Sequence, residues 1–157
     1  MARLTFLGTR AEIEEKTENH YYHSSLLLQI LHPYSFRLVI DYGMIHSYDL
    51  SILKPDAILI THAHPDHYIW TKEEANNATP VYLTRETLEY GKFSPVNPHI
   101  FYPFQWFPLG PVQILPYRVM HSIRCPAVGF KIQLPDDKVV VYNPDLVDMI
   151  SKDIILP

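Results

Sequence analysis

Ala57-Ile58-Leu59-Ile60-Thr61-His62-Ala63-His64-Pro65-Asp66-His67 is the stretch that decides how this chain is interpreted. The short apolar run at 57–61 is typical of a strand that is buried on both faces. Such a strand carries the chain to the edge of an open α/β sheet, where functional sites are usually placed. Residues two apart on extended backbone point the same way, so His62 and His64 can hold one ion together. Asp66 and His67, at the turn that follows, are expected to point to a second position close by.

The side chains in this stretch suit metal chemistry. Imidazole nitrogen and carboxylate oxygen are good ligands for zinc, manganese or iron, and the absence of thiolates argues against a structural cysteine–zinc site. Two metal ions about 3.5–4 Å apart can clamp a bridging water and both oxygens of a displacement reaction. The alternative is a group of surface histidines at a turn. Four potential ligands within six residues, directly after a buried strand, favour the metal site.

Length and composition set the class of protein. The chain has 157 residues, of which 47% are hydrophobic and 19% charged, so we expect one folded domain over residues 1–157. The net charge is −4 and the 13 basic residues are scattered, which argues against nucleic acid as a partner. One cysteine, Cys125, excludes an intrachain disulfide and fits a reducing compartment. No apolar run approaches the length that spans a bilayer, so we expect a cytoplasmic protein with no membrane segment.

Short β-type runs dominate the remaining sequence, which predicts an α/β unit with strands in the majority. Strands are expected at 3–7, 24–31, 36–41, 57–61, 80–83, 112–119, 128–134 and 139–142, with a hairpin turn at 32–35. Helices are expected at 67–76, at 85–90 with Thr84 as N-cap, and from about Asp145 onward. Residues 9–23 are expected to form a loop, 92–111 an irregular wall or edge segment, and 154–157 the entry to another strand.

The motif His-Ala-His-Pro-Asp-His at 62–67 resembles the H-x-H-x-D-H signature of the metallo-β-lactamase superfamily. Its surroundings are similar too, with R-L-T-F-L-G-T at 3–9, S-S-L-L-L at 24–28, L-V-I-D-Y-G at 38–43 and D-A-I-L-I-T at 56–61. The resemblance extends from Arg3 to about Asp148. It implies a four-layer αββα sandwich, of which this chain contains mostly the N-terminal part, with the metals in a cleft at the sheet edges.

The resemblance also implies ligand positions. They are His62, His64 and His121 at the first metal, Asp66 and His67 at the second, and Asp145 as a bridge between the two. Asp41 matches an acidic position that supports and orients ligand histidines. Other interpretations stay open for three of these residues. His121 could be an ordinary loop histidine, Asp145 a helix N-cap, and Asp41 a turn residue at a strand end.

The other residues with reactive side chains are expected to have no part in the chemistry. His20 and His23 are interpreted as solvated residues of a loop that could overhang the cleft, and His32, His46 and His99 as structural residues. The aromatic stretch around Trp106 is expected to pack against the body of the protein. Cys125 is expected to be a small, packed side chain without reactivity.

Residues around the third histidine indicate a branch of the superfamily. Met120-His121-Ser122, followed by A-V-G-F at 127–130, is more similar to ribonuclease Z and cyclic phosphodiesterases than to β-lactamases and thioester hydrolases, which carry a Gly-rich segment there. The basic, Gly-rich arm that handles transfer-RNA precursors is not found. We therefore expect a small phosphodiester or related ester as substrate, and a chain that could form a homo-oligomer.

The implied activity is metal-dependent hydrolysis. Two divalent ions, zinc first and manganese or iron as alternatives, would activate water, and Asp66 would orient that water or move its proton. A hydrolase of carboxylic esters, lactones or thioesters is the alternative within the same chemistry. A non-catalytic metal-binding fragment or scaffold is the alternative from another class.

One feature departs from the superfamily pattern. A last histidine usually reaches the second metal from the later part of the chain, but no histidine follows His121 here. A fragment of a longer protein, a partner chain that supplies the ligand, or a weak second site would each account for this. We favour the fragment, and we expect the second metal to bind poorly.

Overall fold

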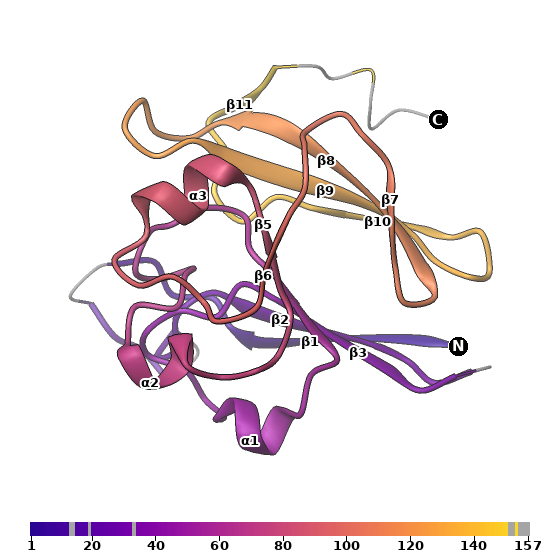
Figure 1. Ribbon diagram of the computed structural model, residues 1–157, viewed down its shortest axis with the longest axis horizontal. Coiled ribbons are helices and arrows are strands. Elements are labelled where there is room, and N and C mark those ends of the chain that lie inside the picture. The colour runs from indigo at the N-terminus through magenta and orange to yellow at the C-terminus, as the bar shows by residue number, and fades with distance from the viewer. Residues whose placement is uncertain (13–14, 19, 33, 151–152, 154–157) are drawn as a thin grey trace.

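A computed structural model describes residues 1–12, 15–18, 20–32, 34–150 and 153. Two β-sheets face each other, one built from the first hundred residues and the other from the rest (Figure 1). The strand expected at 154–157 lies outside the described residues. The α/β sandwich expected from the sequence is confirmed.

The direction of the strands in the first sheet places the motif at 62–67 at one edge of that sheet. Its six strands lie in the order β1 (Ala2–Gly8), β2 (Ser25–Ile30), β3 (Phe36–Ile40), β4 (Ala57–Leu59), β5 (Val81–Leu83) and β6 (Pro98–Ile100). β1, β2 and β3 pair antiparallel, whereas β3 to β6 pair parallel. The carboxyl ends of the four parallel strands therefore lie at the same edge of the sheet.

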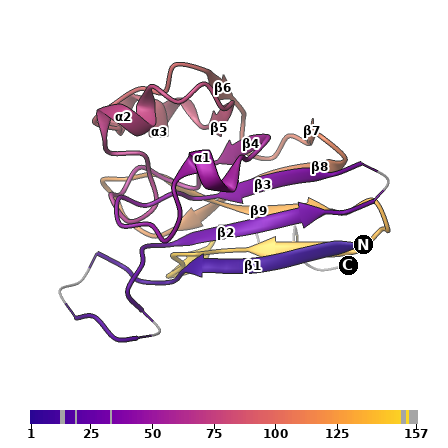
Figure 2. The same cartoon turned by 90° about the horizontal axis from the view of Figure 1, so that it is seen from below.

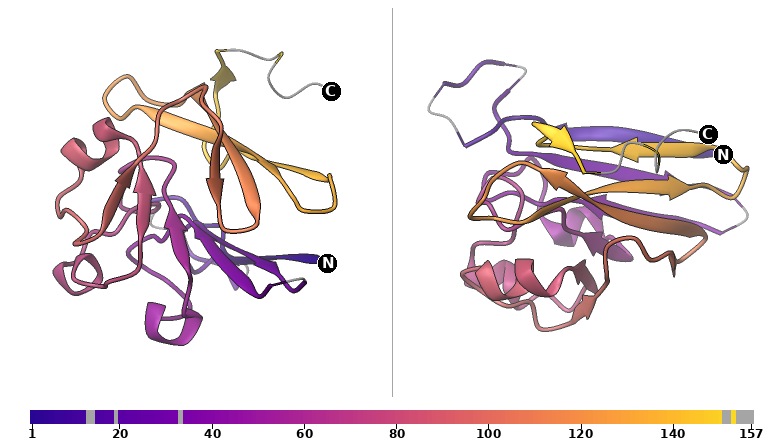
Figure 3. Two further views of the ribbon diagram at one scale, coloured as in Figure 1. Left: turned by 45° about the vertical axis from the view of Figure 1, so that its right-hand side comes forward. Right: turned by 90° about the horizontal axis from the view of Figure 1, so that it is seen from above.

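The second sheet is antiparallel. Four strands lie in the order β10 (Val139–Tyr142), β9 (Ala127–Gln133), β8 (Val112–Met120) and β11 (Asp148–Met149), and β7 (Phe107–Leu109) pairs with β8. Figure 3 shows the two sheets facing each other. They bury a common apolar core between them. Alternate residues of β2 point into it, and Ile114, Phe130 and Ile132 meet them from β8 and β9.

Three short helices pack against the outer face of the first sheet (Figure 2). They are α1 (Leu50–Leu53), α2 (Lys72–Ala75) and α3 (Arg85–Tyr90). Thr71 caps α2 by accepting a hydrogen bond from the Glu74 amide, and Thr84 caps α3 through the Thr87 amide. Within the described ranges, helices cover one outer face only, so three of the four expected layers are present. None of these helices has the length or the apolar character needed to cross a membrane.

The sequence predicted most strands and the helix α3 correctly, but two predicted helices were wrong and one helix was not predicted. The helix expected at 67–76 is reduced to α2, because residues 66–69 are all buried and an amphipathic helix would expose part of that run. The segment at 92–111, expected to be an irregular wall or edge, contains two short strands, β6 at the edge of the first sheet and β7 beside β8. The helix α1 was not predicted. Instead of a helix after Asp145, the chain forms β11, in which Asp148 pairs with Met120 of β8.

Candidate metal centre

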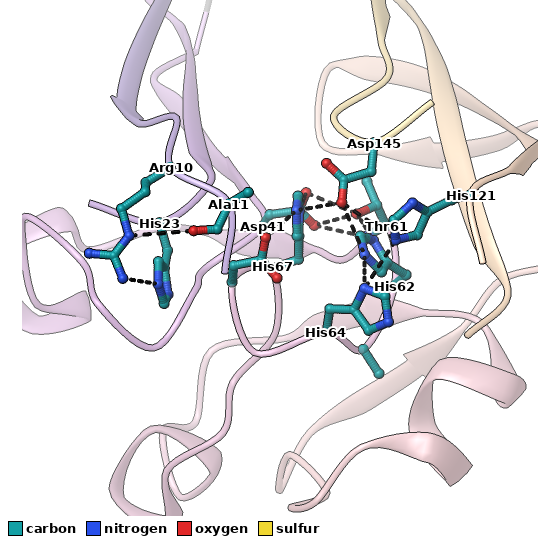
Figure 4. Close-up of polar contacts among 12 residues, drawn as sticks. Arg10, Ala11, His23, Asp41, Thr61, His62, His64, His67, His121 and Asp145 are labelled. Atoms are coloured by element: carbon teal, nitrogen blue, oxygen red, sulfur yellow. Dashed lines mark hydrogen bonds and ion pairs between the residues drawn. The ribbon is translucent and has the colours of Figure 1, made fainter. Parts of the chain in front are cut away.

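Four segments that are distant in sequence meet at one end of the sandwich (Figure 4). Asp41 directly follows β3 and the motif at 62–67 follows β4, and these two strands run parallel. His121 directly follows β8, and Asp145 lies in the turn after β10. All six residues predicted as metal ligands are therefore brought together, with side chains from both sheets.

Three imidazole rings form the first group of donor atoms. His64 Nδ1 lies 3.1 Å from His62 Nε2 and 3.0 Å from His121 Nε2. Asp145 Oδ2 lies 3.7 Å from His62 Nε2 and 3.5 Å from His121 Nε2, so the four atoms converge on one point. Nitrogens bound to a tetrahedral zinc at about 2.0–2.1 Å lie about 3.3 Å apart, which is close to the spacing found here. The first group therefore fits a divalent ion without rearrangement.

Asp66, His67 and Asp145 form the second group. His67 Nε2 lies 3.3 Å from Asp66 Oδ2 and 3.4 Å from Asp145 Oδ2. This nitrogen is buried and has no hydrogen-bond partner of good geometry. A buried polar atom without a partner is costly, and a cation held together with the two carboxylates would satisfy it. Within the described part of the chain, this group has three donor residues.

A buried carboxyl group contacts a ring of the second group directly and a ring of the first group through Thr61. Asp41 is completely buried and accepts a hydrogen bond of 2.9 Å from His67 Nδ1. It also accepts a hydrogen bond of 2.8 Å from the Thr61 amide, and the Thr61 hydroxyl lies 2.9 Å from Asp41 Oδ2 and 3.0 Å from His62 Nδ1. Asp41 has a φ of 59°, a left-handed conformation that Asp tolerates better than most residues. Asp41 thus lies against His67, and the supporting role that the resemblance implied stays a prediction.

Burial and neighbouring charges shift the pKa values of these groups in different directions. The pKa of His62 falls to about 2, because the ring is buried and lies beside other imidazoles, His67 first. A neutral ring is the form that binds metal. Burial alone would lower the pKa of His67, but the Asp41 carboxylate and its neighbours raise it well above its usual value. Burial opposes ionisation of Asp145, yet the close approach and charge of His67 bring its pKa to about 2.

Sequence reasoning missed two residues near this centre. Thr61 links Asp41 to His62, and its place directly before the motif was a signal that could have been used. His23 was expected to be solvated, but it is buried, with Arg10 Nη2 3.2 Å from its Nε2 and the Ile45 amide donating to its Nδ1. Figure 4 places Arg10 and His23 to one side of the histidine cluster.

The remaining histidines lie outside both groups of donors. His20 is exposed and contacts Thr9, His46 lies between Asp49 and Glu74, His99 contacts Asn97, and His32 is exposed. Cys125 is buried in the core beneath the helices, and burial raises the pKa of its thiol. Trp106 is half-exposed at the rim of a hollow of about 320 Å³.

Comparison with known proteins identifies the family. A profile of the beta-lactamase superfamily domain matches residues 19–155, which is most of the chain. No curated protein sequence matches this chain. Several solved structures share its fold.

The metallo-beta-lactamase fold protein YhfI from Bacillus subtilis is 21% identical over 90% of this chain and 62% of its own, with a TM-score of 0.67. A diphosphatase from the PhnP family is 18% identical over 83% of this chain and 61% of its own, with a TM-score of 0.56. The metallo hydrolase Igni18 from the archaeon Ignicoccus hospitalis is 17% identical over 88% of this chain and 59% of its own, with a TM-score of 0.56.

This chain thus spans about three-fifths of the length of each of these three structures. The profile match extends from before β2 to beyond β11, so it includes every residue of the two donor groups. The chain belongs to the beta-lactamase superfamily and has the metallo-β-lactamase fold.

Proposed function

We propose that this chain is a divalent-metal-dependent hydrolase that cleaves a small phosphodiester or a related ester. The observation that carries the proposal is the convergence of His62 Nε2, His64 Nδ1 and His121 Nε2 on one point, with Asp145 Oδ2 beside them. Imidazole nitrogens together with a carboxylate oxygen are the set of donors that zinc binds in proteins. The second group next to it provides a place for another ion.

The chain's residues divide into two sets of ligands. His62, His64 and His121 would hold the first ion, Asp66 and His67 the second, and Asp145 would contact both. Bound ions would lower the pKa of a water molecule and stabilise the negative charge that develops on the substrate. Zinc is the ion that the nitrogen-rich first group favours, with manganese or iron as alternatives.

Asp66 is the residue we propose to act on the attacking water. It is buried, and Asp66 Oδ2 lies 3.3 Å from His67 Nε2. Burial would raise the pKa of Asp66, but the close approach and charge of His67 outweigh it and lower the pKa. The carboxylate is therefore ionised at neutral pH, where it can orient a water molecule and accept its proton.

The substrate class is the finer part of the proposal. The similarity to a diphosphatase of the PhnP family supports chemistry at phosphorus. The chain's net charge of −4 makes a nucleic acid a poor partner and a small molecule a better one. A hydrolase of carboxylic esters or thioesters is the alternative within this fold. A non-catalytic metal-binding protein is favoured by the three-donor composition of the second group among the described residues.

Hydrolysis assays with two model substrates test the proposal. The protein, loaded with zinc or manganese, is assayed with bis-p-nitrophenyl phosphate and with p-nitrophenyl acetate. We expect the phosphate to be cleaved, and Asp66→Asn to reduce the rate by about 10²–10⁴-fold. His99→Gln is the matched control, because His99 lies outside both donor groups. Turnover of the acetate alone would favour the carboxylic ester hydrolase, and bound metal without turnover of either substrate would favour the non-catalytic protein.

A further inference from the structure

We infer that an apolar group of the substrate binds in a hollow beside His121, and that Ile123 and Val147 determine this specificity. The inference rests on the proposed hydrolase activity and names the class of its substrate. That class is an ester that carries an alkyl or aryl group on the side away from the leaving group, in place of a nucleoside or a sugar.

Solvent reaches the two donor groups at one place among their members. The side chains of His62 and His67 are fully buried. Those of His121 and Asp145 are 20% and 25% exposed (Figure 4). A small substrate can therefore approach the centre past His121 and Asp145, and the side chains around these two residues are the first that its remaining part would meet.

A hollow of about 270 Å³ lies at this place, with His121 in its wall. Val119 and Met120 lead into His121 at the end of β8, Ile123 follows it in the loop to β9, and Val147 lines the hollow from the start of β11. The Val147 amide donates a hydrogen bond of 2.8 Å to the Met120 carbonyl, which holds the walls together. An apolar cavity of about 150 Å³ is large enough for a benzene ring, so this hollow can hold a ring or a short alkyl chain.

The walls of the hollow suit an apolar occupant. Met120 is 54% exposed, Val147 77%, and Ile123 is fully exposed. Within the described part of the chain, no carboxylate, lysine or arginine lines the hollow, and the Ser122 hydroxyl oxygen already accepts a hydrogen bond from the Arg124 amide. Exposed apolar side chains that lie together mark binding surfaces, and moving an apolar group from water onto them is favourable.

His121 connects the hollow to the metal centre. Its Nε2 belongs to the first donor group, whereas the residue itself lines the hollow. One small phosphodiester could therefore place its phosphate at the donor groups and its apolar ester group between Ile123 and Val147. A nucleoside or a sugar in the same place would lose its hydration without gaining partners, and this loss would select against such substrates.

Methyl NMR of the metal-free protein tests the hollow independently of catalysis. Benzyl alcohol is titrated into protein with ¹³C-labelled isoleucine and valine methyl groups, and glycerol is the polar control probe. We expect benzyl alcohol to shift the resonances of Ile123 and Val147 and to leave those of Ile52, an exposed isoleucine of α1, unchanged. Shifts of equal size at Ile52 and Ile123, or no shift at either, would overturn the inference.

Kinetics of the metal-loaded protein provide the second measurement. Benzyl p-nitrophenyl phosphate and methyl p-nitrophenyl phosphate have the same leaving group and differ in the group that the hollow would bind. We expect kcat/KM to favour the benzyl ester by at least about 10-fold. Ile123→Ser and Val147→Ser, at exposed positions that folding does not depend on, should reduce this ratio, and Ile52→Ser should retain it.

The outcomes separate this inference from the proposed function. A wild-type ratio near one, or a ratio that both serine variants retain, would overturn the inference while the hydrolase stands. Cleavage of neither phosphate, with benzyl alcohol bound at Ile123 and Val147, would overturn the proposed function instead. A dimer in analytical ultracentrifugation that Ile123→Ser dissociates would also overturn the inference, because a second copy would then fill the hollow.

Discussion

Replacement of Asp41 by Asn tests whether one buried carboxylate supports the whole centre. The two side chains have nearly the same shape, but Asn has one acceptor oxygen and presents N–H donors at the other position. In the unsubstituted protein, Asp41 faces three donor groups, which are the Thr61 amide, the Thr61 hydroxyl and His67 Nδ1. At least one of them would face an N–H group in the variant.

The size of the effect follows from these contacts. A hydrogen bond to a charged group contributes about 1.5–3 kcal/mol, and a buried donor left without a partner costs about 1–3 kcal/mol. Since losses in one network are not additive, we expect the free energy of unfolding of Asp41→Asn to fall by about 2–4 kcal/mol. Both donor groups should also lose metal affinity, by about 10–100-fold, because each contains a ring that Asp41 orients.

Urea unfolding gives the stability, and calorimetric titration of the folded protein with zinc gives the affinities. Asp56→Asn is the matched control, because Asp56 is an exposed carboxylate that accepts a single hydrogen bond from the Arg37 amide. We expect this control to lose about 1 kcal/mol or less and to bind zinc normally. If folded Asp41→Asn bound zinc within about threefold of the wild type, the supporting role of Asp41 would be refuted.

Three other measurements address separate features. Gly43→Ala should lower the free energy of unfolding by about 1–3 kcal/mol, because an added Cβ would lie 2.3 Å from the Asp66 carbonyl oxygen and 2.4 Å from His23 Cβ; an unchanged thermal midpoint would contradict this. Cys125, buried and with its thiol pKa raised by burial, should react slowly with an alkylating reagent in the folded protein and rapidly after denaturation. Equal rates in both states would show that the thiol is accessible. Because carboxylates raise the pKa of His67, metal uptake at the second group should release a proton near neutral pH and weaken as the pH falls. Zinc-binding enthalpies that do not depend on the ionisation enthalpy of the buffer would argue against that proton release.

The sequence was most informative where chemistry and backbone geometry are local. The motif at 62–67 could be placed after a strand, and the β-type runs at 36–41 and 112–119 predicted the strands that lead to Asp41 and His121. Thr84, recognised as an N-cap, does begin α3. In each of these cases the deciding signal lies within a few residues of the feature that it predicts.

Tertiary packing decided the features that the sequence did not reveal. The expected helix at 67–76 starts five residues late, since His67, Tyr68 and Ile69 are all buried between the sheet and the loops around it. His23 resembles any loop histidine in sequence, and its burial results from tertiary contacts with residues such as Arg10, Gly43 and Ile45. The role of Thr61 likewise depends on Asp41, twenty residues earlier in the chain.

His64 and His121 are 57 residues apart in sequence, yet their ring nitrogens lie side by side at the junction of the two sheets. An ion held by both would act as a removable cross-link. Closing a loop of that length costs the unfolded chain about 3–4 kcal/mol of entropy, and a bound ion ties the two layers together as a covalent bridge would. The single cysteine of this chain rules out an internal disulfide, so a bound ion would be its cross-link between the two sheets. Removal of the metal by a chelator would then lower the stability of the fold as well as emptying the centre.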